Sequence, residues 1–175
     1  MARFSAHNLA MRMFFDAIRA LIYSAGFIFF WGYTALWVRQ YDAPLGITLP
    51  SWMPIPGVVL MALGAPIALS CVVAFVVRGR GTPAPFDAPR ELVSAGPYRW
   101  VRNPMYLGGG LIVVGYAFYV RSVSVLLLAA SMWVIVHLFV YFYEEPTLRA
   151  KFNGSYDNYC HEVSRWLPHP PRPTH

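Results

Sequence analysis

The sequence has little charge and little cysteine. Charged residues make up 13% of its 175 residues, whereas apolar residues make up 57%, and the mean hydropathy is +0.45. A soluble domain of this length cannot bury that much apolar surface, which argues against a soluble fold. Cys71 lies within an apolar run and Cys160 in the more polar tail, so the two are expected at different depths, and no C-x-x-C or zinc-type His/Cys spacing occurs. We therefore expect neither a disulfide nor a structural metal.

The apolar residues form four uncharged runs, each near the length of roughly 20 residues that a helix needs to cross a membrane. They lie at residues 20–38, at residues 57–77, between Arg102 and Arg121, and between Arg121 and Glu144. The first run is too long, and the polar segment before it too extended, for a cleaved signal peptide. The predicted fold is all-α: a transmembrane bundle of about four principal spans, followed by short cytoplasmic helices at the carboxyl end.

Basic residues are distributed unevenly around these runs. Of the 14 lysines and arginines, all but Arg39 and Arg121 precede the first run, lie between the second and third runs, or follow the fourth. Because basic flanks are retained in the cytoplasm, both termini and the long middle connection are predicted to be cytoplasmic. Anionic membrane lipids account for the net charge of +6, so no nucleic-acid partner is expected.

The chain is predicted to form one domain over residues 1–168, with a disordered end at residues 169–175. Glu144 and Glu145 precede Pro146, and proline is favoured at the first position of a helix. We therefore expect the fourth helix to end there and the chain to change direction. Two short helices should follow, the second of them amphipathic and lying along the cytoplasmic face.

The third and fourth runs are joined by only two residues, Arg121 and Ser122, and should form a tight antiparallel hairpin. Small residues allow transmembrane helices to approach closely. The glycines of the third run are therefore expected to form a packing face: Gly108, Gly109, Gly110 and Gly115.

Residues 92–108 are denser in arginine, aromatic residues, glycine and proline than an ordinary linker. Gly96-Pro97 and Asn103-Pro104 predict two fixed bends, and the second proline disfavours helical geometry at the residue before it. Taken alone, the arginines of this segment are equally well explained as topology signals that reach the lipid headgroups.

Together with the tail, this segment resembles the superfamily of isoprenylcysteine carboxyl methyltransferases and phospholipid methyltransferases, which are integral membrane enzymes. The resemblance covers residues 92–168. The residues that carry it are Gly96, Pro97, Tyr98, Arg102, Asn103, Pro104, Tyr106, Gly108, Glu144, Glu145, Leu148, Phe152, Gly154, Tyr156, Tyr159, Val163, Arg165 and Pro168. The chain differs at Asn103, where the superfamily usually has histidine. An amide forms hydrogen bonds but does not titrate, so a general base is excluded there.

The resemblance implies S-adenosylmethionine as cofactor, bound in a cytoplasm-facing pocket, and a lipid-soluble or small-molecule methyl acceptor. The positions implied to bind the cofactor are Gly96, Pro97, Tyr98, Arg102, Asn103, Pro104, Tyr106, Gly108, Glu144, Glu145 and Tyr159. Arg102 suits the methionyl carboxylate, and the tyrosines suit adenine or the sulfonium. Glu145 suits the amino group or the ribose. The residues expected to take part in catalysis are Glu145, Arg149 and Arg165.

The same residues allow other interpretations. Glu145 can instead cap the next helix, and Arg149 and Arg165 can instead contact lipid headgroups. His137, within the fourth run, is more simply explained as a packed, hydrogen-bonded histidine than as a catalytic one. Cys160 and His161 are not expected to form a dyad, because neighbours on a helix point in different directions.

The methyl acceptor is also left open by the sequence. It can be a phospholipid amine, a lipid-modified carboxylate such as that of an isoprenylcysteine, or a small thiol or other small nucleophile. Two other classes of protein are a four-span transporter and a non-catalytic membrane scaffold. A proton-coupled transporter usually carries an acidic residue inside a span, whereas the eight carboxylates here lie outside the apolar runs. The oligomeric state is not indicated.

Overall fold

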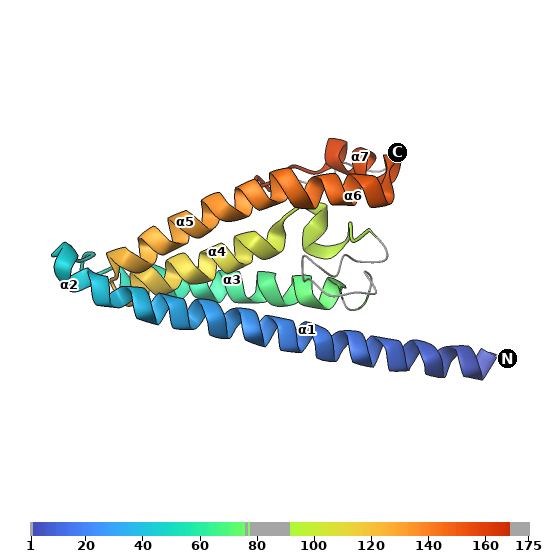
Figure 1. Ribbon diagram of the computed structural model, residues 1–175, viewed down its shortest axis with the longest axis horizontal. Helices are drawn as coiled ribbons and strands as arrows, with labels where there is room; N and C mark the ends of the chain where they lie inside the picture. Colours follow the sequence, from blue (N-terminus) through green and yellow to red (C-terminus); the bar gives the residue numbers. More distant parts are fainter. Residues whose placement is uncertain (1, 76, 78–91, 169–175) are drawn as a thin grey trace.

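The computed structural model describes residues 2–75, 77 and 92–168, and this part of the chain is helical with no strand. Its helices are α1 (Ala2–Val38), α2 (Asp42–Leu45), α3 (Pro54–Ala74), α4 (Pro104–Tyr119), α5 (Val123–Phe139), α6 (Glu145–Phe152) and α7 (Gly154–Glu162). Figure 1 shows the long helices running lengthwise in an elongated bundle. The predicted all-α bundle is confirmed. The predicted disordered end at residues 169–175 and most of the basic middle connection lie outside the described residues.

Three segments are long and apolar enough to cross a membrane: Ala17–Leu45, Pro54–Ala74 and Val123–Phe152. The fourth apolar helix, α4, is shorter at 16 residues and spans about 24 Å, somewhat less than a hydrocarbon core of about 30 Å. These four helices coincide with the four predicted runs. Large apolar side chains remain exposed along them, as at Ile28 and Phe29, which is the surface that lipid covers in an integral membrane protein.

The closest helix packing is between α3 and α4, and glycines on both helices make it possible. A Cβ added at Gly64 would lie 2.5 Å from the Gly108 carbonyl oxygen, and one added at Gly115 would lie 2.7 Å from the Gly57 carbonyl oxygen. The predicted packing role of Gly108 and Gly115 is therefore confirmed, although their partner is α3 and not the other arm of the hairpin. An added Cβ meets nothing within 4 Å at the other two predicted positions, Gly109 and Gly110.

The hairpin between α4 and α5 turns at Arg121, whose φ of 55° is left-handed, and at Ser122. The Ser122 hydroxyl accepts a hydrogen bond from the Val125 N–H at 3.1 Å and so caps α5. Val125 and Ala117 form a buried cluster with Ala35 of α1 near this turn. Away from the turn the axes of α4 and α5 separate (Figure 1), and the tail and residues 92–104 lie at this wider end.

The predicted break at Glu145 is wrong. Residues 140–144 form one π-helical turn that joins α5 to α6, and Glu144 and Glu145 both keep right-handed helical angles. A π-helical turn has wider i→i+5 hydrogen bonding. It therefore accommodates Pro146, which has no N–H to donate, without a change of direction.

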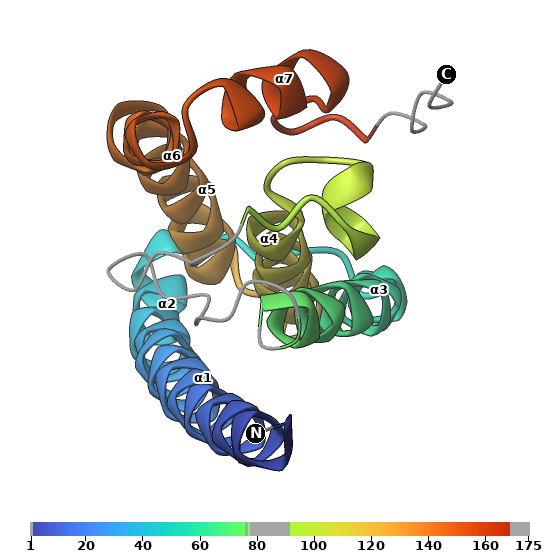
Figure 2. The same ribbon diagram turned by 90° about the vertical axis from the view of Figure 1, so that its right-hand side faces the viewer.

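The last two helices form a layer at the wider end of the bundle. Figure 2 shows α7 lying across this end, above α4 and the 3-10 helix Gly96–Arg99. The buried side chains of α7 and the residue after it, Tyr156, Tyr159 and Val163, pack against Leu92 and against α6. The predicted amphipathic tail helix is thus confirmed, and as predicted the first tail helix ends before residues 153–154, where Asn153 has a φ of 47°.

Candidate functional site

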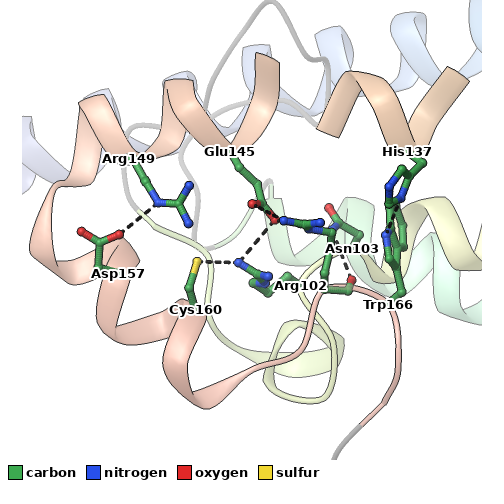
Figure 3. A network of polar contacts seen from close by, with 9 residues as sticks. Arg102, Asn103, His137, Glu145, Arg149, Asp157, Cys160 and Trp166 are labelled. Atoms are coloured by element: carbon green, nitrogen blue, oxygen red, sulfur yellow. Dashed lines mark hydrogen bonds and ion pairs between the residues drawn. The ribbon is translucent and has the colours of Figure 1, made fainter. Parts of the chain in front are cut away.

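The side chain of Glu145 lies at the centre of a buried polar cluster between the last long helix and the tail (Figure 3). The residue is 2% exposed. Arg165 binds it with two hydrogen bonds, Nε to Oε1 at 2.7 Å and Nη2 to Oε2 at 2.9 Å. Arg102 Nη1 lies 3.3 Å from Oε1. One buried carboxylate thus joins two guanidinium groups that come from segments far apart in the sequence.

Arg102 reaches this carboxylate from the segment that precedes α4. Its Nη1 also donates to the sulfur of Cys160, which lies on α7. Its Nε is buried and has no hydrogen-bond partner among the described residues. An unpaired N–H on a buried charged group is costly, so this edge of the guanidinium favours an additional acceptor.

Two hydrogen bonds fix the segment after α7 to the segment before α4. The Arg102 N–H donates to the Ser164 carbonyl at 2.9 Å, and Asn103 Nδ2 donates to the Arg165 carbonyl at 3.2 Å. Asn103 has non-helical angles, with φ −121° and ψ 52°, as predicted from the proline that follows. Arg102 and Arg165 are therefore held together by their backbones as well as through Glu145.

Tyr98 and Tyr159 join the same two segments. The Tyr159 hydroxyl donates to the Tyr98 carbonyl at 2.7 Å, and both side chains are buried. Burial raises the pKa of both phenols above the ordinary value. Tyr159 is therefore protonated, and able to donate this hydrogen bond, throughout the physiological range.

Glu144 points in a different direction from Glu145. Its Oε2 accepts a hydrogen bond from the Tyr106 hydroxyl of α4 at 2.8 Å. The two neighbouring carboxylates thus have different environments, because Glu145 is paired with arginines and Glu144 with a phenol.

An aromatic group ties the tail to the outer side of α5. Trp166 Nε1 donates to His137 Nδ1 at 3.1 Å, and its ring lies 4.6 Å from that of Trp133. The Arg165 guanidinium carbon lies 5.3 Å from the ring centroid of Tyr141. The interpretation of His137 as a packed, hydrogen-bonded histidine is confirmed.

Arg149, one of the residues expected in catalysis, is not brought to this cluster. It pairs with Asp157 at 3.1 Å, and the two side chains are 49% and 53% exposed. An exposed pair of this kind is typical of a solvated or headgroup-facing surface. Arg149 and Arg165, for which the sequence predicted the same role, therefore have different partners in the structure.

The glycines and prolines of the motif shape the backbone around the cluster. Gly96 has a φ of 64°, in the left-handed region that favours glycine, and Pro97 is the second residue of the 3-10 helix. Pro104 is fully buried at the start of α4. Gly108 contacts α3 and contributes to helix packing.

Sequence reasoning missed two contributors to the cluster, Cys160 and the carbonyl of Ser164, and it also missed the contact between Trp166 and His137 outside the cluster. The helical spacing of Tyr156, Tyr159 and Val163 was the available signal for Cys160, because it places the cysteine on the buried face of α7. The Ser164 carbonyl and Trp166 carried no signal, since their partners lie more than 25 residues away in the chain.

The cluster brings two positively charged guanidinium groups together around a buried carboxylate. Two guanidinium groups share one carboxylate, which leaves a net positive charge beside the unpaired Nε of Arg102. The hydrogen bond to Glu145 raises the pKa of Arg165, so its charge is permanent. Such a site is chemically suited to bind an anionic group such as a carboxylate or phosphate.

Comparison with known proteins agrees with the resemblance seen in the motifs. The family model described as phospholipid methyltransferase matches residues 52–155, which run from the start of α3 into α7 and make up more than half of the chain. Tyr159, Cys160 and Arg165 lie beyond the matched segment. Searches of curated proteins and of solved structures gave no significant match. The chain belongs to the phospholipid methyltransferase family of membrane proteins.

Proposed function

We propose that this protein is an integral membrane methyltransferase that uses S-adenosylmethionine and acts on a lipid-soluble acceptor at the cytoplasmic face of the membrane. Membership of the family supports the activity. The observation that carries the proposal is the buried Arg102, Glu145, Arg165 cluster, because it lies where the membrane helix that contains Glu145 meets the tail. Its chemistry suits the anionic parts of cofactor and acceptor.

The residues present fit this cofactor. The buried, unpaired Nε of Arg102 is suited to the methionyl carboxylate. Glu144, which a tyrosine and not an arginine engages, is suited to the amino group. Tyr98, Tyr106 and Tyr159 are aromatic residues of the motif segments, and they suit the adenine and the sulfonium. The cofactor, when bound, supplies the electrophilic methyl group.

The chain's own contribution is to bind, to orient and to exclude water. Methyl transfer is an in-line displacement, so the acceptor atom has to be held at a short distance and in line with the methyl group. We assign Arg165 to the anionic group of the acceptor, because its guanidinium reaches from the cluster to Tyr141, an exposed residue of the π-helical turn between α5 and α6. An acceptor entering from the lipid would meet it there.

The type of acceptor determines whether a proton has to move. A carboxylate nucleophile needs no base and is held by the arginine. An ammonium has to lose a proton first, and Glu144 is the carboxylate proposed to accept it, since the oxygens of Glu145 are engaged by arginines. Isoprenylcysteine carboxylates and phospholipid amines are thus both compatible acceptor types, and a small thiol is the alternative.

Cofactor binding and methyl transfer are tested separately. Calorimetry on the detergent-purified protein should detect S-adenosylmethionine binding, and labelled methyl should be transferred to a component of a total lipid extract. Arg102→Ala should weaken cofactor binding by at least about tenfold, because it removes a charge-assisted pair worth roughly 1.5 to 3 kcal/mol. Arg149→Ala is the matched control and should bind normally. A folded wild-type protein that does not bind the cofactor would indicate a scaffold or a transporter.

A further inference from the structure

Asn103 occupies the position just before α4, where an asparagine ordinarily caps the helix. A capping side chain accepts a hydrogen bond from a backbone N–H of the first turn. No such hydrogen bond is formed here. The side-chain amide instead donates to the carbonyl of Arg165, which lies 62 residues further along the chain. Helix capping therefore does not explain the asparagine.

The Asn103 amide binds the tail backbone directly beside a second hydrogen bond, which holds the preceding residue. The Arg102 N–H donates to the Ser164 carbonyl at 2.9 Å, and Asn103 Nδ2 donates to the next carbonyl at 3.2 Å. Two consecutive residues before α4 therefore hold the carbonyls of two consecutive residues in the tail. Translation and rotation of the tail about Arg165 are both restricted, since two hydrogen bonds define a direction as well as a point.

The restricted residue is the one whose side chain chelates Glu145. A bidentate pair between arginine and carboxylate tolerates little displacement of either backbone, because both N–H···O contacts have to be kept at once. The contacts are 2.7 Å and 2.9 Å. Asn103 is 7% exposed, so water has little access to replace its amide.

We propose that Asn103 is a positioning residue for methyl transfer, acting through the carbonyl of Arg165. Its donor holds Arg165 in the orientation that presents the guanidinium to the anionic group of the acceptor. The inference rests on the proposed function and extends it to a residue that neither titrates nor needs to touch the acceptor. It requires a hydrogen-bond donor at position 103, and the residue type matters only for that donor.

The test compares substitutions that differ in this donor. Asn103→Asp has nearly the same shape but no N–H, and it places a carboxylate against a carbonyl oxygen. Asn103→His restores an N–H at similar reach. We expect Asn103→Asp to lower kcat/KM for the acceptor by about tenfold or more, with the dissociation constant of S-adenosylmethionine changed less than about threefold. We expect Asn103→His to recover most of the activity.

Limited trypsin cleavage after Arg165 gives a second measurement that does not depend on turnover. It should be several times faster in Asn103→Asp than in the wild type, and near the wild-type rate in Asn103→His. Trp166→Phe is the matched control, because it loses the contact to His137 but keeps the Asn103 donor; it should retain kcat/KM within about threefold.

Three results would overturn the inference. One is unchanged kcat/KM in Asn103→Asp, and another is an equal loss in Asn103→Asp and Asn103→His. The third is a parallel loss of cofactor affinity and of kcat/KM, which would make Asn103 a cofactor-binding or general structural residue and not a positioning residue for the acceptor. A wild-type protein that neither binds S-adenosylmethionine nor methylates any lipid contradicts the proposed function itself, and with it a positioning role, whatever the trypsin rates.

Discussion

Glu145 contacts both arginines of the cluster, and this limits what it can do itself. Each of its oxygens accepts at least one guanidinium N–H. These contacts engage both oxygens of Glu145 with arginine, whereas the Glu144 carboxylate accepts from the Tyr106 hydroxyl. We therefore propose that Glu145 orients Arg102 and Arg165, and that Glu144 receives a proton where the acceptor requires it.

Glu145→Gln should lower the free energy of unfolding by about 3 kcal/mol, because it removes the charge that compensates two largely buried guanidinium groups. Denaturant unfolding in detergent measures this loss. Asp157→Asn is the matched control, and it should cost less than about 1 kcal/mol, since its pair with Arg149 is about half exposed. Equal, small losses in the two variants would contradict a buried ion-pair cluster.

Stability should fall at alkaline pH because of the buried tyrosines. Burial raises the pKa of Tyr98 and Tyr159 in the folded protein, whereas both titrate near about 10 when unfolded. The contribution of the two phenols to the free energy of unfolding is complete below about pH 10. It decreases above that pH, because the phenols lose their protons in the unfolded chain before they do so in the folded protein. Unfolding measured between about pH 8 and 11 should show this slope. Tyr159→Phe should reduce it, and an unchanged slope would exclude Tyr159 as a contributor.

The approach of α3 to α4 is predicted to depend on particular glycines. Gly64→Ala should lower the free energy of unfolding by about 1 to 3 kcal/mol, since its Cβ would lie 2.5 Å from the Gly108 carbonyl oxygen. Gly109→Ala adds the same methyl group where nothing lies within 4 Å. It should be neutral or slightly stabilising, because alanine favours a helix. Similar stability of the two variants would contradict the close packing.

The four long helices could be predicted from the sequence because apolar length and the absence of charge are local signals. The partner of α4 was not predicted. Its glycines Gly108 and Gly115 have the same spacing as Gly57 and Gly64 on α3, and matching these two pairs would have identified the contact. The two-residue connection to α5 instead led to the prediction that the α4 glycines pack within the hairpin. A short connection, however, only requires α4 and α5 to meet at their turn.

Local signals also failed at Pro146. Proline after two carboxylates is a reasonable start for a new helix, but a π-helical turn allows the old helix to continue into α6. This places Glu144 and Glu145 within the continuous apolar helix Val123–Phe152, near its end. These two of the eight carboxylates therefore lie inside a candidate membrane span, which corrects the prediction that all eight lie outside the spans. The contacts of Glu145 distinguish it from the free carboxylate of a proton-coupled transporter, because both of its oxygens are engaged by guanidinium groups.

The choice between Arg149 and Arg165 could not be made from the sequence. Arg149 follows Glu145 by four residues on one helix, a spacing that favours an ion pair. The tail nevertheless brings Arg165 to Glu145, and Arg149 pairs with Asp157 instead. Long-range contacts through the tail decide the pairing, and they depend on how α7 packs against residues 92–104.

In the whole molecule, the candidate site and the opposite turns lie at different ends of the bundle. The amino-terminal end of α1, the start of α4 and the tail helices are at one end, whereas α2 and the turn at Arg121 are at the other (Figure 1). Asp42 of α2 accepts a hydrogen bond from the Ser124 N–H at 2.9 Å, and Arg121 donates to the Leu49 carbonyl at 2.8 Å, which closes that end. Among the described basic residues, those of residues 92–104 and of the tail lie at the end with the cluster, whereas Arg39 and Arg121 lie at the other end.

This separation predicts which residues are reached from each side of the membrane. Ser51 lies between α2 and α3, Ser155 lies in α7, and both are exposed. Ser155→Cys should be labelled by a membrane-impermeant maleimide only when the cytoplasmic face is accessible, and Ser51→Cys only when the other face is, because basic flanks remain in the cytoplasm. The unmodified chain gives the background, since Cys71 is buried and Cys160 is partly covered. Labelling of both variants from one side would contradict the bundle as a transmembrane arrangement. Labelling from opposite sides in the reverse sense would keep the bundle and place the arginine cluster on the non-cytoplasmic face, where an intracellular cofactor such as S-adenosylmethionine would not reach it.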